Sequence, residues 1–207
     1  MTKLSVFFGT TLVAAAAISM AAVARHNSVS VGSPAPSFDA TDSNGNAVKL
    51  SDYKGKYVVL EWANFDCPYV KKHYNSHNMQ NLQKTYTDKG VVWLTVFSSP
   101  EGMQGYYPAG TLNSMAKSKG MSSTLIPDPK GALGTIYNAT NTPDMFVIDP
   151  KGDLIYAGAI DSNRSPDPAA IKTSTNYVAA ALDEAMAGKP VTTKSSRPYG
   201  CGIHYGD

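Results

Sequence analysis

Two apolar segments joined by a helical segment constrain the fold of this chain more than any other feature. Residues 57–62 and 91–97 indicate strands buried in a sheet, and the second is of the parallel-sheet kind. Between them, apolar residues recur at roughly helical spacing from Pro68 until Gly90 ends the helix. The sequence therefore predicts a strand, one long helix and a second strand, with Cys67 at the first junction.

The remaining segments predict an α/β domain with a mixed sheet. Asn44-Gly45 is the strongest hairpin signal in the chain and lies between short strands at 37–40 and 47–50. Two more strands, 145–148 and 154–160, are joined by a turn suited to an antiparallel pair. Helical segments are expected at 112–119, at 132–137, and over one long amphipathic stretch from Pro168, capped by Asp167, to Gly188. The order is hairpin, β, α, β, α, α, β, β, α, within a single domain.

Composition excludes several classes of protein. The chain of 207 residues has 18 basic and 16 acidic side chains, a net charge of +2, and no run of Lys or Arg, which argues against a nucleic-acid partner. Its two cysteines exclude a disulfide-dense scaffold and a four-cysteine zinc or iron–sulfur site built from this chain alone.

The N-terminus predicts export. An apolar run from Leu4 to Met20 is followed by Ala22-Val23-Ala24, which is typical of a signal peptide (residues 1–24) cleaved after Ala24. The alternative is an uncleaved membrane anchor. No later segment is long and apolar enough to cross a bilayer, so we expect a periplasmic or secreted domain (25–190) with a cysteine-containing tail (191–207) and no membrane contact after cleavage. Disulfides persist in such a compartment.

Cys67 is the most informative residue. The start of a helix offers unpaired N–H groups and the positive end of the helix dipole, and both favour an anion. A free thiol is about 3% thiolate at pH 7, and lowering its pKa by about two units makes the thiolate the majority form. Positive charge is expected from Lys71, Lys72 and His73, opposed by Asp66. The alternative is an inert buried cysteine.

Thr142-Pro143, before the 145–148 strand, is the second informative feature. The proline is either an ordinary residue at a strand edge or a cis-proline opposite Cys67, which would leave the preceding backbone free to pair with an incoming chain.

Together these residues resemble the redoxin group, the peroxiredoxin-like branch of the thioredoxin fold, which includes relatives of alkyl hydroperoxide reductase and thiol-specific antioxidant. Two segments, Asp66–Lys72 and Tyr199–Ile203, are similar to those of an exported subgroup of redoxins. The whole resemblance covers roughly residues 31–205 and is carried by Pro34–Phe38, Asp42–Trp62, Asp66–Lys72, Asn141–Asp149 and Tyr199–Ile203. It implies a thioredoxin-like fold, with a mixed central sheet flanked by helices and an N-terminal β-hairpin extension. It also implies that Pro143 is the cis-proline.

The chain departs from the family at the cysteine. Asn64 and Val70 stand where a Cys-x-x-Cys motif would place its second cysteine. Asn64 and Leu60 stand where a peroxiredoxin carries Thr or Ser and Pro. Exchange within one helical turn is therefore absent, and the peroxide-activating pattern is not reproduced.

Cys201 is expected to resolve an oxidised Cys67 through a Cys67–Cys201 disulfide, formed after attack of the Cys67 thiolate on a peroxide or a disulfide. The alternative is a permanent structural disulfide, which would stabilise the fold by about 5 kcal/mol through loop entropy alone.

Other residues predict weaker roles. Arg164 is expected to polarise a bound oxyanion, with Thr142 and Pro143 contacting substrate, or else to be a solvated loop residue. His73 and His77 lie four residues apart, but we expect no metal there, and the histidine pair with Cys67 is the alternative.

The sequence thus predicts a thiol-dependent oxidoreductase without a bound cofactor. Its partners would be a thioredoxin-like electron donor, a disulfide-bearing client protein or a peroxide. The alternatives are a thioredoxin-fold scaffold of the cell envelope with a structural disulfide, and a copper- or haem-handling thiol protein.

Overall fold

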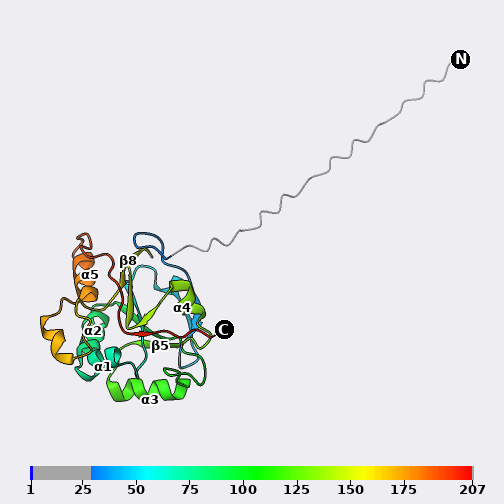
Figure 1. Cartoon of the computed structure of the whole chain (residues 1–207). Coiled ribbons are helices and arrows are strands. Elements are labelled where there is room, and N and C mark those ends of the chain that lie inside the picture. Colours follow the sequence, from blue (N-terminus) through cyan, green and yellow to red (C-terminus); the bar gives the residue numbers. More distant parts are fainter. Residues whose placement is uncertain (2–28, 207) are drawn as a thin grey trace.

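A five-stranded sheet with helices on both faces forms the centre of the molecule (Figure 1). The structure is a computed structural model that describes residue 1 and residues 29–206. The predicted cleavage site after Ala24 lies outside the described residues. The strand order is β5-β4-β3-β7-β8, in which β3, β4 and β5 are parallel to one another and β7 and β8 are antiparallel to their neighbours. The predicted mixed sheet is confirmed. The bounds are β3 (Val58–Trp62), β4 (Val92–Phe97), β5 (Thr124–Pro127), β7 (Asp144–Ile148) and β8 (Leu154–Gly158).

The predicted unit of two parallel strands and a helix is confirmed, with one correction. The segment between β3 and β4 forms two helices, α1 (Pro68–Asn75) and α2 (Asn78–Thr87), instead of one. His77 lies in the left-handed region with φ 59°, which interrupts the helical hydrogen-bond pattern. The Ser76 hydroxyl donates to the Lys72 carbonyl at 2.7 Å and so satisfies an end of α1.

The hairpin is also confirmed, as β1 (Asp39–Thr41) paired with β2 (Ala47–Lys49). It leads into a short 3₁₀-helix η1 (Leu50–Tyr53). Strand β5 was not predicted from the sequence. The prediction of one long helix from Pro168 is wrong. A 3₁₀-helix η2 (Pro168–Thr173) comes first. The helix α5 (Tyr177–Met186) begins after Asn176, whose side chain caps it by accepting the Ala179 N–H. The remaining helices are α3 (Ala109–Lys119) and α4 (Ala132–Tyr137).

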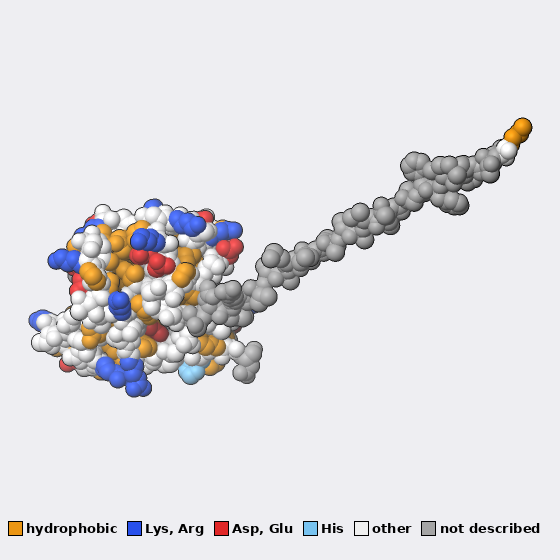
Figure 2. Space-filling model, turned by 90° about the horizontal axis from the view of Figure 1, so that it is seen from above, with side chains coloured by type: hydrophobic (Ala, Val, Ile, Leu, Met, Phe, Trp, Pro, Cys, Tyr) orange, Lys and Arg blue, Asp and Glu red, His pale blue; other side chains and the backbone are white. Residues whose placement is uncertain are grey.

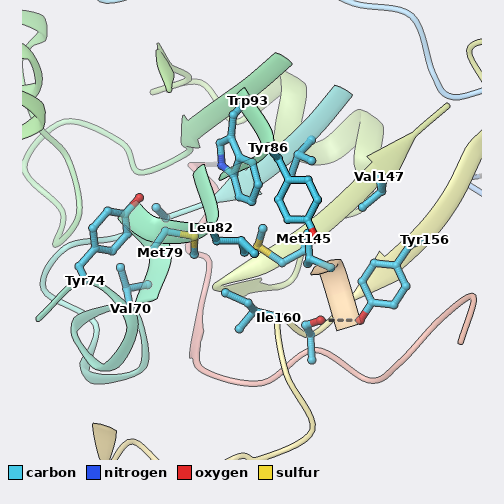
Figure 3. Close-up of a cluster of buried hydrophobic side chains, with 14 of the residues drawn as sticks. Val70, Tyr74, Met79, Leu82, Tyr86, Trp93, Met145, Val147, Tyr156 and Ile160 are labelled. Carbon is cyan, nitrogen blue, oxygen red and sulfur yellow. Dashed lines mark hydrogen bonds between the residues drawn. The ribbon is translucent and has the colours of Figure 1, made fainter. Parts of the chain in front are cut away.

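The sheet separates two apolar cores. Side chains of one face pack against α1, α2 and α5, and Figure 3 shows Met79, Leu82 and Tyr86 of α2 directed toward Trp93 and Met145 on the strands. Neighbouring strand residues point the other way, toward the hairpin and α4. They include Leu60, Trp62, Val96 and Phe146. This alternation explains why the strands are apolar on both faces.

One carboxylate lies inside the first core. Glu61, in the middle of β3, is fully buried and accepts hydrogen bonds from Tyr74, Gln83, Trp93 and Thr95 at 2.8–3.2 Å. Burial raises the pKa of Glu61, and the four donors act against that rise. The hydrogen-bonding capacity of this carboxylate is therefore used within the core, and its role on this face of the sheet is structural.

After α5, the chain returns along the domain as an ordered strap, which we define as residues 191–206. In Figure 1 it is the orange-to-red segment that crosses the end of the sheet. It pairs with Ala157 through residues 194 and 196, and its strand β9 (Cys201–Gly202) pairs antiparallel with β6 (Asn141–Thr142). The strap therefore brings residue 201 to the start of β7.

On one face of the molecule, surface charge is dispersed. Figure 2 shows basic side chains scattered over the face seen from above, with acidic ones between them. Within the described part of the chain, no helix combines the length and the apolar character needed to cross a membrane.

Candidate functional site

Cys67 is the residue that caps α1, as predicted. It follows β3 directly, and its carbonyl accepts the Lys71 N–H at 2.9 Å in the first turn of the helix. Its thiol donates to the Thr142 carbonyl at 3.1 Å. The sulfur is thus held between the helix N-terminus and the segment that precedes β7.

The peptide bond between Thr142 and Pro143 is cis, as the resemblance implied. The backbone before it is paired, because Thr142 lies opposite Cys201 in the β6–β9 ladder. The Cys201 N–H points at the Cys67 sulfur, with 3.4 Å between the nitrogen and Sγ. Two cysteines 134 residues apart in sequence are therefore brought together beside the cis-proline, and both are free thiols.

The two thiols differ in acidity. Burial raises the pKa of Cys67, but hydrogen bonds from Cys201, Thr142 and the Val70 and Cys201 N–H groups outweigh it, so the pKa lies below its usual value. Burial and the neighbouring Cys67 raise the pKa of Cys201 to about 12. Cys67 is thus the member of the pair that ionises first.

The Thr142 hydroxyl is buried and has no hydrogen-bond partner among the described residues. A hydroxyl in such a position is free to donate to an ionised Cys67. Such a bond would favour the thiolate and so lower the pKa of Cys67.

Cys67 itself is 0% exposed: it packs in the first apolar core, and the strap residue Cys201 contacts its sulfur. The sequence predicts a reactive sulfur at the helix N-terminus but not that this sulfur is buried. Cys201, in contrast, is partly exposed. Cys201 is therefore the more exposed of the two cysteines.

The positive charge expected around Cys67 is largely absent. The Lys72 ammonium pairs with Asp161 at 3.0 Å, and both side chains are buried. Burial lowers the pKa of His73 to about 4, so this ring is neutral at pH 7. Lys71 is exposed to solvent, while Asp66 accepts the Tyr107 hydroxyl at 2.9 Å. The acidity of Cys67 therefore comes from hydrogen bonds rather than from nearby cations.

Lys72 and Asp161 belong to a buried polar cluster, which we define as Lys72, His73, Asp161 and Tyr199. The Tyr199 hydroxyl donates to Asp161, and Lys72 reaches that hydroxyl at 3.3 Å. The His73 ring lies 3.4 Å from the same hydroxyl. Because Tyr199 is two residues before Cys201, this cluster fixes the strap to α1 next to the cysteine pair.

The sequence did not predict this cluster, because its members come from three distant segments. The available signal was indirect: a lysine and a histidine on a half-buried helix, and an acidic residue directly after an apolar strand. Complementary charges at such positions become meaningful only once the fold places them together.

Two other predicted features lie apart from the pair. Arg164 is exposed in the loop after β8, and no ion pair within residues 29–206 joins it to another residue, so its role in substrate binding stays a prediction. His73 is buried in the polar cluster while His77 is exposed. The described residues contain no group of three or more His, Cys, Asp or Glu side chains arranged to hold a metal ion.

Comparison with known proteins connects this geometry to a family. ResA of Bacillus subtilis, a thiol-disulfide oxidoreductase, is 29% identical over 135 residues, which cover 65% of this chain and 70% of ResA. Among solved structures, an uncharacterised conserved protein of Geobacillus kaustophilus is similar with a TM-score of 0.73 at 26% identity, covering 87% of this chain and 94% of that one. A protein of Chlorobium tepidum, provisionally described as the thiol:disulfide interchange protein DsbE, has a TM-score of 0.54 at 25% identity, covering 75% of this chain and 99% of that one.

These likenesses confirm the thioredoxin-like fold predicted from the sequence. The model of the AhpC/TSA family matches residues 31–157, which include β3, Cys67 and the cis-proline. The chain therefore belongs to the AhpC/TSA family of redoxins.

Proposed function

We propose that this protein is a thiol-disulfide oxidoreductase whose redox pair is Cys67 and Cys201. The observation that carries the proposal is the 3.4 Å distance between the Cys201 nitrogen and the Cys67 sulfur, beside a β6–β9 ladder that ends directly before the cis-proline. This pair replaces the Cys-x-x-Cys motif that Asn64 and Val70 rule out.

In the proposed cycle, the two thiols become one disulfide. Cys67 is the nucleophile because its thiolate is the more stable of the two. It forms the disulfide bond with Sγ of Cys201. Formation of the disulfide releases two protons and two electrons, which a disulfide-bearing client accepts as it becomes a dithiol. The Thr142 carbonyl and the Cys201 N–H hold the sulfur in place, and the exchange needs no bound cofactor.

Disulfide exchange is favoured over peroxide reduction. A peroxidase must admit peroxide to its reactive sulfur, and Cys67 is 0% exposed. The chain also lacks the family residues that activate peroxide, since Leu60 and Asn64 occupy those positions. A scaffold protein with a permanent disulfide is the competing proposal.

We further propose that the protein works outside the cytoplasm, after removal of residues 1–24. The apolar N-terminal run and Ala22-Val23-Ala24 support this location. A thioredoxin-like donor or a client with exchangeable thiols is the partner that the chemistry requires.

The test is a redox titration of the protein without residues 1–24, the form expected after export, in glutathione buffers of graded potential, with mass spectrometry of the alkylated peptides. Wild type is expected to gain one Cys67–Cys201 disulfide in a two-electron transition. The Cys67→Ser and Cys201→Ser variants are expected to gain none. A disulfide that persists below about −300 mV would indicate a structural staple, and absence of the disulfide at every potential would overturn the proposal.

A further inference from the structure

The two cysteines of the proposed pair are exposed unequally. Cys67 is 0% exposed, whereas Cys201 is partly exposed and is followed by the exposed Gly202. The inference drawn from this difference rests on the proposed function, because it concerns the order in which the same two cysteines exchange.

The cover over Cys67 is fixed on the N-terminal side of Cys201. The Ser196 hydroxyl accepts the Ala159 N–H at 3.0 Å and contacts the Tyr156 hydroxyl at 2.7 Å. Tyr199 is buried, and its hydroxyl donates to Asp161 in the polar cluster. This part of the strap is therefore attached to both β8 and α1.

The cover is fixed on the C-terminal side as well. The Ile203 N–H donates to the Thr140 carbonyl at 3.0 Å, and the Tyr205 hydroxyl donates to the Ala139 carbonyl at 2.6 Å. The Tyr205 ring also lies against Gly131 and Gly134, where an added Cβ would come within 2.5 Å of its atoms. Uncovering Cys67 would require these contacts to break together.

We propose that Cys201 is the sulfur that exchanges with external thiols, and that Cys67 is the internal sulfur that is released and that re-forms the bond. In the first step, an external thiolate attacks Sγ of Cys201 in the Cys67–Cys201 disulfide. The bond between the two protein sulfurs breaks, a mixed disulfide forms on Cys201, and Cys67 leaves as a thiolate. A second external thiolate then attacks the external sulfur of the mixed disulfide, so that the external thiol is oxidised to its disulfide and Cys201 leaves and takes up a proton.

The acidities of the two thiols agree with this direction. Disulfide exchange is faster when the departing thiol is the more acidic one. Hydrogen bonds stabilise the Cys67 thiolate, and the Cys201 pKa of about 12 makes Cys201 the poorer leaving group. Access and leaving-group ability therefore select the same sulfur for attack.

The same geometry predicts how the Cys67–Cys201 disulfide forms again. When a mixed disulfide is present on Cys201, the Cys67 thiolate lies next to it and attacks Sγ of Cys201, which expels the external thiolate. Cys67 then acts as a nucleophile only toward a sulfur that its own strap presents. This differs from a site in which a client meets the helix-capping cysteine first.

The experiment uses the protein without residues 1–24 and has two measurements. The first compares the single-cysteine variants Cys67→Ser and Cys201→Ser in reaction with 5,5′-dithiobis(2-nitrobenzoate), in buffer and in denaturant. The thiolate fraction of each variant is read from the pH dependence of its rate. At equal thiolate fraction, the remaining Cys201 is expected to react about tenfold or more faster than the remaining Cys67 in buffer, with the difference lost on unfolding. Faster reaction of Cys67 in folded protein at equal thiolate fraction would overturn the proposal.

The second measurement treats oxidised wild type with glutathione, quenches with acid at short times and alkylates the free thiols. Glutathione is expected on Cys201 and the alkyl group on Cys67; glutathione mainly on Cys67 would overturn the inference while leaving the redox pair intact. Failure to form the Cys67–Cys201 disulfide at all would instead overturn the proposed function. In the Cys201→Ser background, Tyr205→Ala is expected to raise the reactivity of Cys67 by loosening the strap, and an unchanged rate would contradict the covering role.

Discussion

Gly200 is the residue on which the approach of the two cysteines depends most closely. Its φ is +124°, and a Cβ there would lie 2.0 Å from the Thr142 carbonyl oxygen. We predict that Gly200→Ala pushes β9 away from β6, costs about 1–3 kcal/mol of stability, and slows formation of the Cys67–Cys201 disulfide. Chemical denaturation and the rate of disulfide formation in oxidised glutathione measure these two effects.

Gly202 provides the matched control. It lies in β9, two residues after Gly200, and no atom lies within 4 Å of the position where a Cβ would stand. Gly202→Ala is expected to leave the rate of disulfide formation unchanged. Equal effects of the two substitutions would show that the close approach at residue 200 is not what positions Cys201.

His73 makes the stability of the protein depend on pH. Its pKa is lowered to about 4 in the fold, first by burial, with the Lys72 charge in the same direction and Asp161 opposing. Between about pH 4 and 6.5 the unfolded chain binds the extra proton and the folded one does not, so this residue lowers stability as pH falls through that window. The expected loss is about 3 kcal/mol at most.

The measurement is denaturant unfolding of wild type and His73→Gln between pH 4 and 7. The variant is expected to show a smaller loss of stability toward low pH, and His77→Asn, which changes an exposed histidine, is expected to follow wild type. Asp144 contributes the opposite slope in both proteins, since burial raises its pKa to about 7. Identical pH profiles for wild type and His73→Gln would exclude His73 as the source.

At the level of elements, the Lys72–Asp161 ion pair joins α1 to the segment after β8. Removing one member of a buried pair leaves an uncompensated charge, so Lys72→Met is expected to cost about 3–5 kcal/mol. A double variant, Lys72→Met with Asp161→Leu, is expected to lose less than the sum of the two single variants. Thermal and chemical denaturation of the four proteins provide the double-mutant cycle.

An exposed pair on α2 is the control for that cycle. Lys84 and Asp88 lie 2.9 Å apart with both side chains largely in solvent. Lys84→Met is expected to cost less than about 1 kcal/mol. Additive losses at Lys72 and Asp161 would show that the two charges do not stabilise each other.

Elements with their own local signal could be predicted from the sequence, and elements that depend on a neighbour could not. The hairpin has Asn44-Gly45 and the strands β3 and β4 have long apolar runs. Strand β5 has only four residues and is defined by its pairing with β4. The break between α1 and α2 lies at His77, and its only local signal is one interval of five residues, Tyr74 to Met79, in an apolar spacing of three or four.

The same division applies to the candidate site. Cys67 was placed correctly because a strand end, a cysteine and a helix-starting proline are adjacent in the sequence. Its burial, and the cluster around Tyr199, depend on where residues 191–206 lie. A tail rich in Ser, Pro and Gly contains no local signal for that path, because its structure is set by contacts with the finished domain.

At the scale of the whole molecule, a Cys67–Cys201 disulfide would link the junction of β3 and α1 to the C-terminal strap. It would close a loop of 134 residues, and loop entropy gives such a closure about 5 kcal/mol. We therefore predict that oxidised wild type unfolds at a temperature about 10 °C or more above the reduced protein. Calorimetry of both forms tests this.

The Cys201→Ser variant is the control, because it is expected to unfold at the same temperature with and without reductant. A difference that persists in this variant would have to come from something other than the pair. Equal unfolding temperatures for oxidised and reduced wild type would mean that the bond strains the fold as much as it constrains the unfolded chain.

The strap that covers Cys67 is also the last part of the described domain to be synthesised. Its hydrogen bonds reach β6, α1 and the segment after β8, so residues 191–206 need these elements in place before they can dock. We therefore expect the Cys67 thiol to be more accessible in a folding intermediate whose strap has not docked than in the native protein.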